Sequence, residues 1–373
     1  MIRRAALASL MLCLATPAVA ADAPPPVAFR ATMDALAAVL TTLLPEALDR
    51  RPVDEARAAR IKESVASLER VTGELARLHG ADLPDADPTL GVIFGELGRA
   101  VADVRKSKPD RLPQTALSVA STCLACHTRA ASVSKDIGLG PVDARLDGDV
   151  RADILVATRR FDDARRAYRG VVFDEAFATA QPWRFERAAR RALALEVRVM
   201  EDPAQAKAIA VRVLETPSAE ALWPAADAWR ADLSDWSSEP KDEPPLARAA
   251  RLMNDALAER TPRGDAQNEV LFLRATAAIH SALSSSSPMT LLERAQALSW
   301  LGIAYGALAE LDVWGLFLAF DAACVEAAPK TALARSCLAR YERAVVELYG
   351  GTGGVTLPPE QEQQLRVLRR TAR

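Results

Sequence analysis

Aromatic residues make up only 5% of this 373-residue sequence, and its apolar half is mostly Ala and Leu, with few β-branched residues. Sheets draw on β-branched and aromatic residues, whereas Ala and Leu favour helices. The composition therefore excludes a β-sandwich and a barrel, and the 50% of hydrophobic residues exclude a disordered chain. We predict an all-α protein, long enough for two or more domains.

The sequence also lacks a marked excess of charge, since 47 Lys and Arg residues stand against 49 Asp and Glu residues. A net charge of −2 gives no reason to expect nucleic acid or a membrane as a partner. There is no Gly-x-Ser-x-Gly motif and no Gly-rich phosphate loop, and the chain has only three histidines. We therefore expect a protein that is not an enzyme.

The N-terminus has the features of an exported protein. Arg3 and Arg4 precede an apolar run that ends at Ala18, and small residues at positions −3 and −1 fit cleavage before Ala21. The run is short for a bilayer span, and no later stretch is expected to cross a membrane. These features predict a signal peptide over residues 1–20 and a mature protein in the periplasm.

Residues 21–132 contain four segments in which apolar residues recur at alternating steps of three and four. This spacing is typical of helices that pack lengthwise against their neighbours. Helices are predicted from about 29 to 47, 61 to 78, 88 to 104 and 112 to 126. Four similar helices with short connections predict an antiparallel four-helix bundle.

The fourth segment ends in the motif Cys123-Leu124-Ala125-Cys126-His127. Two thiols one helical turn apart can add to the two vinyl groups of a haem, and the adjacent imidazole can bind its iron. A redox-active disulfide would need a strand–helix context, and a zinc site would need another Cys/His pair nearby. The motif therefore predicts one covalent haem c.

The place of this motif, near the end of the last of four helices, resembles the cytochrome c′ family over about residues 24–132. The resemblance implies that Cys123 and Cys126 form thioethers and that His127 is the proximal iron ligand. In that family a residue early in the first helix faces the other side of the iron, and Met33 lies in the matching segment. Met33 is then either the sixth ligand or a packing residue, and His79 is an alternative ligand.

The family often has an aromatic–basic pair shortly after the motif histidine, and this sequence has Thr128-Arg129-Ala130-Ala131 there instead. Arg129 is expected either to pair with a haem propionate or to be solvated.

Residues 133–149 are rich in Gly, Ser and Pro and are predicted to link the haem domain to a helical array over residues 150–373. The segment from Ala152 to Tyr168 resembles the middle of a tetratricopeptide unit, although Arg159-Arg160 stands in place of the usual turn glycine. Further helical segments recur in pairs, as in α-solenoids. We expect the tryptophans of this region to be structural and to pack in its core, and the alternative for one or two of them is a place on a concave binding face; they are Trp183, Trp223, Trp229, Trp236, Trp300 and Trp314.

Cys324 and Cys337 lie on either side of Pro329, one on each helix of a predicted hairpin. In an oxidising compartment we expect a disulfide between them, and two buried thiols are the alternative.

These features predict a periplasmic c-type cytochrome that transfers electrons and docks a redox partner protein through its helical array. A Met33 ligand opposite His127 would limit the reorganisation of the iron when it changes oxidation state. Two other functions remain open: a five-coordinate haem that binds a gas such as NO or CO, and a partner-binding scaffold with a structural haem. The sequence leaves homodimer formation open.

Overall fold

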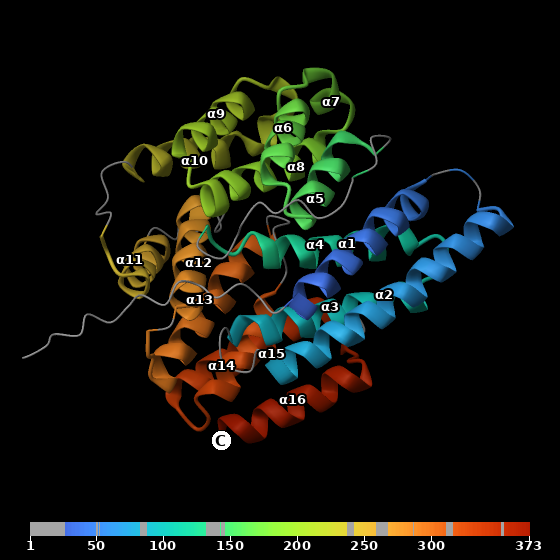
Figure 1. The fold of residues 1–373 in the computed structure, drawn as a ribbon. Helices are drawn as coiled ribbons and strands as arrows, with labels where there is room; N and C mark the ends of the chain where they lie inside the picture. The colour runs from blue at the N-terminus through green and yellow to red at the C-terminus, as the bar shows by residue number, and fades with distance from the viewer. Residues whose placement is uncertain are drawn as a thin grey trace, which may run out of the picture.

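The structure is a computed structural model, and it describes residues 27–49, 51, 53–82, 88–131, 142, 146–236, 242–258, 268–285, 287–310, 316–351 and 354–373. The predicted signal peptide and most of the predicted linker lie outside these residues. The described chain is helical apart from a short antiparallel pair, β1 (Gly350–Gly351) and β2 (Gly354–Val355). The prediction of an all-α protein is therefore confirmed (Figure 1).

The first four helices correspond to the four predicted amphipathic segments. Helix α1 packs against α2 and α4, and α3 packs against the same two helices, so that the four close on one another (Figure 1). The apolar stripes meet inside, where Leu36, Leu43, Leu68, Leu75 and Leu97 are buried. The bounds of the four helices are α1 (Val27–Leu48), α2 (Glu55–Asp82), α3 (Pro88–Lys106) and α4 (Leu112–His127).

Helix α1 is also long and apolar enough, by length and composition, to cross a membrane. The expectation that no segment after residue 20 would reach this hydropathy is therefore wrong. A core helix of a soluble protein meets the same criterion, and the apolar face of α1 packs against α2 and α4, with Leu40 and Leu44 fully covered. Hydropathy along the chain does not distinguish this packing face from a lipid-facing one.

The next part of the chain forms helix pairs, with α5 against α6 and α9 against α10 (Figure 1). A turn of π-helix follows α8 and ends at Met200, and a 3₁₀ turn precedes α10. In order, the elements are α5 (Gly148–Ala157), α6 (Phe161–Val172), α7 (Glu175–Ala180), α8 (Pro182–Leu195), the π-helix Glu196–Met200, α9 (Pro203–Leu214), the 3₁₀ turn Pro217–Leu222 and α10 (Trp223–Asp235).

The C-terminal part continues in the same way, with α11 against α12 and α13 against α14. Helices α14 and α15 form the predicted hairpin, and Cys324 and Cys337 join them through a buried disulfide with a sulfur–sulfur distance of 2.03 Å. The disulfide prediction is confirmed. These elements are α11 (Pro245–Ala258), α12 (Glu269–Leu283), α13 (Leu291–Glu310), α14 (Phe317–Ala327), α15 (Ala332–Tyr349) and α16 (Pro359–Ala372).

The tryptophans differ in burial, and the expectation that they pack in the core does not hold for all of them. Trp229 is fully buried and donates a hydrogen bond of 2.9 Å to Glu269, but Trp183 is 62% exposed at the start of α8. Trp183 lies under the guanidinium of Arg187, which explains how a large ring is tolerated at the surface. Trp314 lies outside the described residues.

The first four helices rest on the later ones mainly through α4, which packs against α5, and through α3, which contacts α12 and α14. Arg191 of α8 connects the two parts, because it pairs with Asp153 of α5 and donates a 3.3 Å hydrogen bond to Ser121 of α4. The end of α4 is thus enclosed by helices that follow it in the chain.

Candidate functional site

The motif occupies the last turns of α4. Pro113 at the start of the helix suits its first turn, where no main-chain donor is needed. At the other end, the Thr128 amide and hydroxyl both bond to the Leu124 carbonyl oxygen, at 2.9 and 2.7 Å. Because α4 ends at His127, the motif residues lie at the end of the helix that faces the later helices.

The two motif cysteines are not joined to each other by a disulfide, unlike Cys324 and Cys337. Cys123 is 6% exposed and Cys126 is half-buried. Burial, together with the neighbouring Cys126, raises the pKa of the Cys123 thiol to about 12. Cys123 is therefore a protonated thiol at neutral pH in the folded chain.

His127 is buried between α4 and the end of α5. Burial lowers the pKa of His127 to about 3, with a further contribution from the positive charges of Arg159 and Arg129. Hydrogen bonds with the main chain of Ala157 and Val156 act in the opposite direction but do not reverse the shift. The imidazole is therefore neutral at physiological pH, which is the form that binds a metal ion.

The end of α5 is shaped by a residue that the sequence analysis noted as unusual. Arg159 has a φ of 54°, the left-handed conformation that a glycine normally supplies. The Arg160 amide bonds to the Leu155 carbonyl oxygen at 2.8 Å and the Arg159 amide bonds to that of Val156 at 2.9 Å, as in a Schellman cap. The turn places both the main chain and the guanidinium of this segment close to His127.

Arg129 is buried, so the solvated one of the two alternatives for this side chain is wrong. Its Nε donates a 3.0 Å hydrogen bond to the carbonyl oxygen of Cys126, and its Nη1 donates one of 2.7 Å to Oγ1 of Thr89 in α3. Both Arg129 and Thr89 are almost fully covered. Arg129 therefore holds the segment after the motif against the start of α3, and helix packing draws it inward.

A chain of buried hydrogen bonds continues from this segment into the C-terminal helices. Arg198, which is fully buried in the π-helix, donates to the carbonyl oxygen of Arg129 at 3.2 Å and to the Tyr305 hydroxyl at 2.8 Å. The same hydroxyl lies 3.0 Å from Nε2 of His280. Burial and the charges of Arg129 and Arg198 hold the pKa of His280 well below its usual value, so His280 is a neutral core residue that bonds through Nε2.

Neither Arg198 nor Tyr305 was predicted from the sequence to be a functional residue. One feature of the sequence could have pointed to Arg198, because it is a single charged residue inside the apolar run Val197-Arg198-Val199-Met200. A charged side chain in such a run is either exposed or buried with polar partners.

Met33 lies on α1, half-buried, with its side chain against the apolar core. Four residues earlier, Phe29 contacts Phe94 of α3 with a ring separation of 6.2 Å. Because α1 packs against α4, Met33 belongs to a helix next to the motif. The side chain of His79, the alternative ligand, lies outside the described residues.

Covalent haem requires two thiols one turn apart and an imidazole whose other nitrogen is held by a neighbouring group. Cys123 and Cys126 supply the thiols on one helix, and His127 is neutral and bonded to the main chain of α5. The donor set therefore fits the group. Within the described residues, the motif included, no three or more His, Cys, Asp or Glu side chains come together in a group that could hold a metal ion.

Comparison with models of known protein families gives no match for this chain. The same holds for comparison with curated proteins and with solved structures. The assignment of the site therefore depends on the motif and its surroundings.

Proposed function

We propose that this chain is a periplasmic c-type cytochrome that carries one covalent haem and transfers electrons. The observation that carries the proposal is the state of the motif at the end of α4: two cysteines not joined by a disulfide and a buried, neutral His127 anchored to the end of α5. The proposal includes an antiparallel four-helix bundle, α1–α4, similar to cytochrome c′. Haem iron, when bound, supplies the one-electron chemistry.

Each motif residue has a separate role in this proposal. Cys123 and Cys126 attach the porphyrin through thioether bonds, and His127 binds the iron. The main chain of Ala157 and Val156 orients the imidazole, as partners of metal-bound histidines commonly do. Arg129 fixes the main chain of Cys126 from the side of α3.

We propose Met33 as the sixth ligand. Support comes from its place early in α1, a helix that packs against α4, and from its half-buried position. A thioether from Met33 would complement His127 as a ligand, and such a ligand would limit the rearrangement that accompanies electron transfer.

The later helices are proposed to dock a redox partner protein. They form repeated helix pairs, an arrangement that presents extended surfaces in other helical-repeat proteins. The proposed periplasmic location is supported by the features of residues 1–20 and by the buried disulfide, since disulfides persist in oxidising compartments.

The test is expression of the full chain in a periplasm with an intact haem-attachment system. We expect a pyridine haemochrome spectrum with one haem per chain and an increase in mass by one haem. Cys123→Ser with Cys126→Ser should abolish both signals. As a matched control, Cys324→Ala with Cys337→Ala removes the other cysteine pair and should keep the haem.

A colourless wild-type protein with no added mass would overturn the cytochrome proposal. A haem with a broad high-spin spectrum that binds CO without displacing a ligand would instead support the gas-binding alternative.

A further inference from the structure

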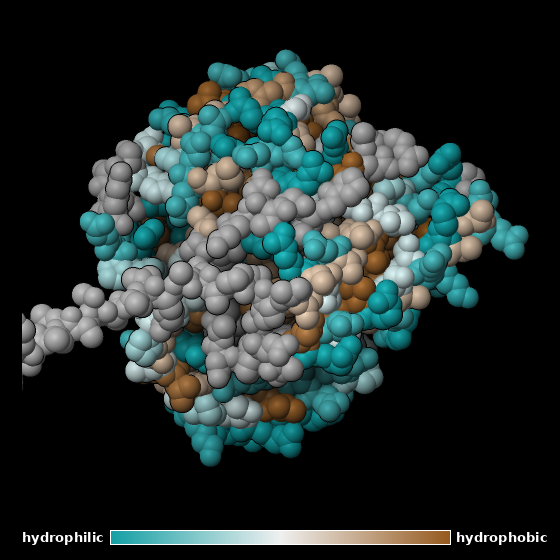
Figure 2. All heavy atoms as spheres, in the orientation of Figure 1, coloured by the Kyte–Doolittle hydropathy of each residue, from teal (hydrophilic) through white to brown (hydrophobic). Residues whose placement is uncertain are grey.

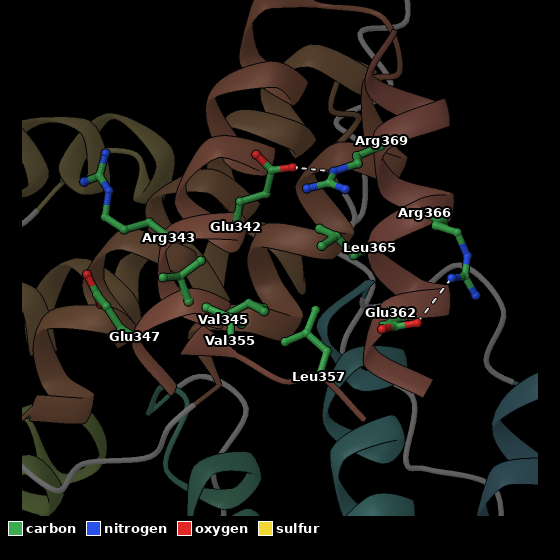
Figure 3. A pocket seen from close by; sticks show the side chains of 11 residues that line it. Glu342, Arg343, Val345, Glu347, Val355, Leu357, Glu362, Leu365, Arg366 and Arg369 are labelled. Carbon is green, nitrogen blue, oxygen red and sulfur yellow. Dashed lines mark hydrogen bonds and ion pairs between the residues drawn. The ribbon is translucent and has the colours of Figure 1, made fainter. Parts of the chain in front are cut away.

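An apolar groove of about 830 Å³ lies between α15 and α16 and continues beside the β1–β2 hairpin (Figure 3). Its floor is formed by aliphatic side chains, among them Val345, Val355, Leu357 and Leu365 (Figure 3). Of the ten large apolar side chains that are exposed in the described part of the chain, five lie between residues 346 and 367. This short stretch therefore carries an unusual share of the exposed apolar surface. On the face of the molecule drawn in Figure 2, smaller hydrophobic patches lie among hydrophilic residues.

The rim of the groove carries equal numbers of acidic and basic side chains. Two ion pairs lie within it, Glu342 with Arg369 at 2.7 Å and Glu362 with Arg366 at 3.4 Å (Figure 3). A site that binds nucleic acid, an anionic membrane or another partner of one charge sign is expected to carry an excess of the opposite charge around its rim. A balanced rim is instead complementary to itself.

Arg343 and Glu347 make this self-complementarity specific. Both are exposed, one turn apart on α15, and on the side of the helix that faces away from α16 (Figure 3). Within the described residues they form no ion pair with each other or with another side chain. Val346, 52% exposed, lies between them in the sequence.

We propose that the chain forms a two-fold symmetric homodimer through the exposed face of α15 that borders this groove, with α15 of one copy lying antiparallel to α15 of the other. In such a pair, a two-fold axis near Val345 and Val346 places Arg343 of each copy opposite Glu347 of the other. Two-fold symmetry repeats this contact, so the same ion pair forms twice. Two equivalent ion pairs then flank an apolar centre formed by the two Val346 side chains. The proposal does not depend on a bound haem.

The test is sedimentation analysis of the mature full-length protein at concentrations up to the order of 100 μM. We expect a dimer. Arg343→Glu should raise the dissociation constant by at least about tenfold, since each substitution sets two pairs of like charges against each other. The combination Arg343→Glu with Glu347→Arg restores opposite charges in reversed order and should recover the wild-type dissociation constant to within about threefold.

Leu291→Asp serves as a control, because Leu291 is an exposed apolar residue at the start of α13, outside the groove, and its replacement should leave the dissociation constant unchanged. A wild-type monomer over the whole concentration range overturns the proposal and assigns the groove to a different occupant. A dimer that is insensitive to Arg343→Glu, or one that the charge exchange does not restore, also overturns it. Absence of haem would contradict only the proposed function.

Discussion

Arg198 donates a 3.2 Å hydrogen bond to the carbonyl oxygen of Arg129, 69 residues earlier in the chain. This contact joins the π-helix that follows α8 to the segment just after the cysteine motif. Its continuation through Tyr305 to His280 adds α13 and α12 to the same network. The segment that follows His127 is therefore held from outside the first four helices as well as from within them.

Removal of the Tyr305 hydroxyl tests this network. Tyr305→Phe keeps the ring but deprives Arg198 and His280 of a buried partner, so we expect the free energy of unfolding to fall by about 1–3 kcal/mol. Urea denaturation measures this loss. Amide hydrogen exchange at Thr128 and Arg129 should also accelerate, because their segment loses support. Tyr349→Phe, at an exposed tyrosine, should change neither quantity, and equal behaviour of the two variants would contradict the role of the network.

Met33→Leu tests the proposed sixth ligand. Leucine conserves the volume of the side chain, so the fold should lose less than about 1.5 kcal/mol of stability. The variant lacks the thioether sulfur, and we expect the sharp low-spin bands of the reduced protein to give way to a high-spin spectrum. Val39→Ala, a packing change elsewhere on α1, should keep the low-spin bands. An unchanged spectrum in Met33→Leu would assign Met33 to packing alone.

Glu269 makes the stability depend on pH. Burial raises its pKa from 4.5 to about 7, against the opposing effects of Arg190, 2.7 Å away, and of Trp229. Between these two pKa values the folded state retains a proton that the unfolded chain loses. The contribution of Glu269 to the free energy of unfolding is therefore complete below the unfolded pKa of 4.5 and is lost as the pH rises through about 7.

Between about pH 5 and about pH 8 we therefore expect the free energy of unfolding of the wild type to fall relative to that of Glu269→Gln, by on the order of 2–3 kcal/mol. Denaturant titrations of both proteins at several pH values measure the difference. Glu362→Gln, at the surface of α16, should follow the wild type. A constant difference between wild type and Glu269→Gln across this range would show that Glu269 titrates normally.

Two glycines of α13 provide a matched pair. A Cβ added at Gly302 would lie 2.5 Å from Oδ1 of Asp321, which pairs with Arg340, whereas at Gly306 the nearest atom is Cβ of Phe317 at 3.8 Å. We expect Gly302→Ala to destabilise the fold by about 1–3 kcal/mol through overpacking. Gly306→Ala should stabilise it by about 0.5–1 kcal/mol, since alanine favours a helix interior. Thermal denaturation compares the two, and equal shifts would contradict the close approach of Asp321.

The helices were predictable because their signal is local. The spacing of apolar residues located α1, α3 and α4 to within two residues, whereas α2 begins six residues before and ends four residues after its predicted bounds. Cys324 and Cys337 could be paired because both lie in one hairpin. The 3₁₀ turn at Pro217 and the π-helix at Glu196 were missed, because the same apolar spacing suits these helices as well as an α-helix.

The surroundings of the motif were much less predictable than the motif itself. Arg129 looked solvated because arginines usually are, and its burial depends on Thr89 and Arg198, which lie far from it in sequence. The neutral state of His127 likewise depends on the end of α5, where Arg159 takes the conformation expected of a glycine. Contacts between distant segments determine these properties, and single-sequence patterns do not encode them.

The enclosure of Cys123 has a consequence for how the protein is made. Helix α4 is packed by α1, α3 and α5, and the Cys123 thiol is 6% exposed, so the finished fold leaves an enzyme little access to it. Any covalent attachment at this thiol must therefore occur on the polypeptide before α5 and the helices behind it assemble. Maturation and folding of this protein are then successive events, and premature assembly would trap an unmodified chain.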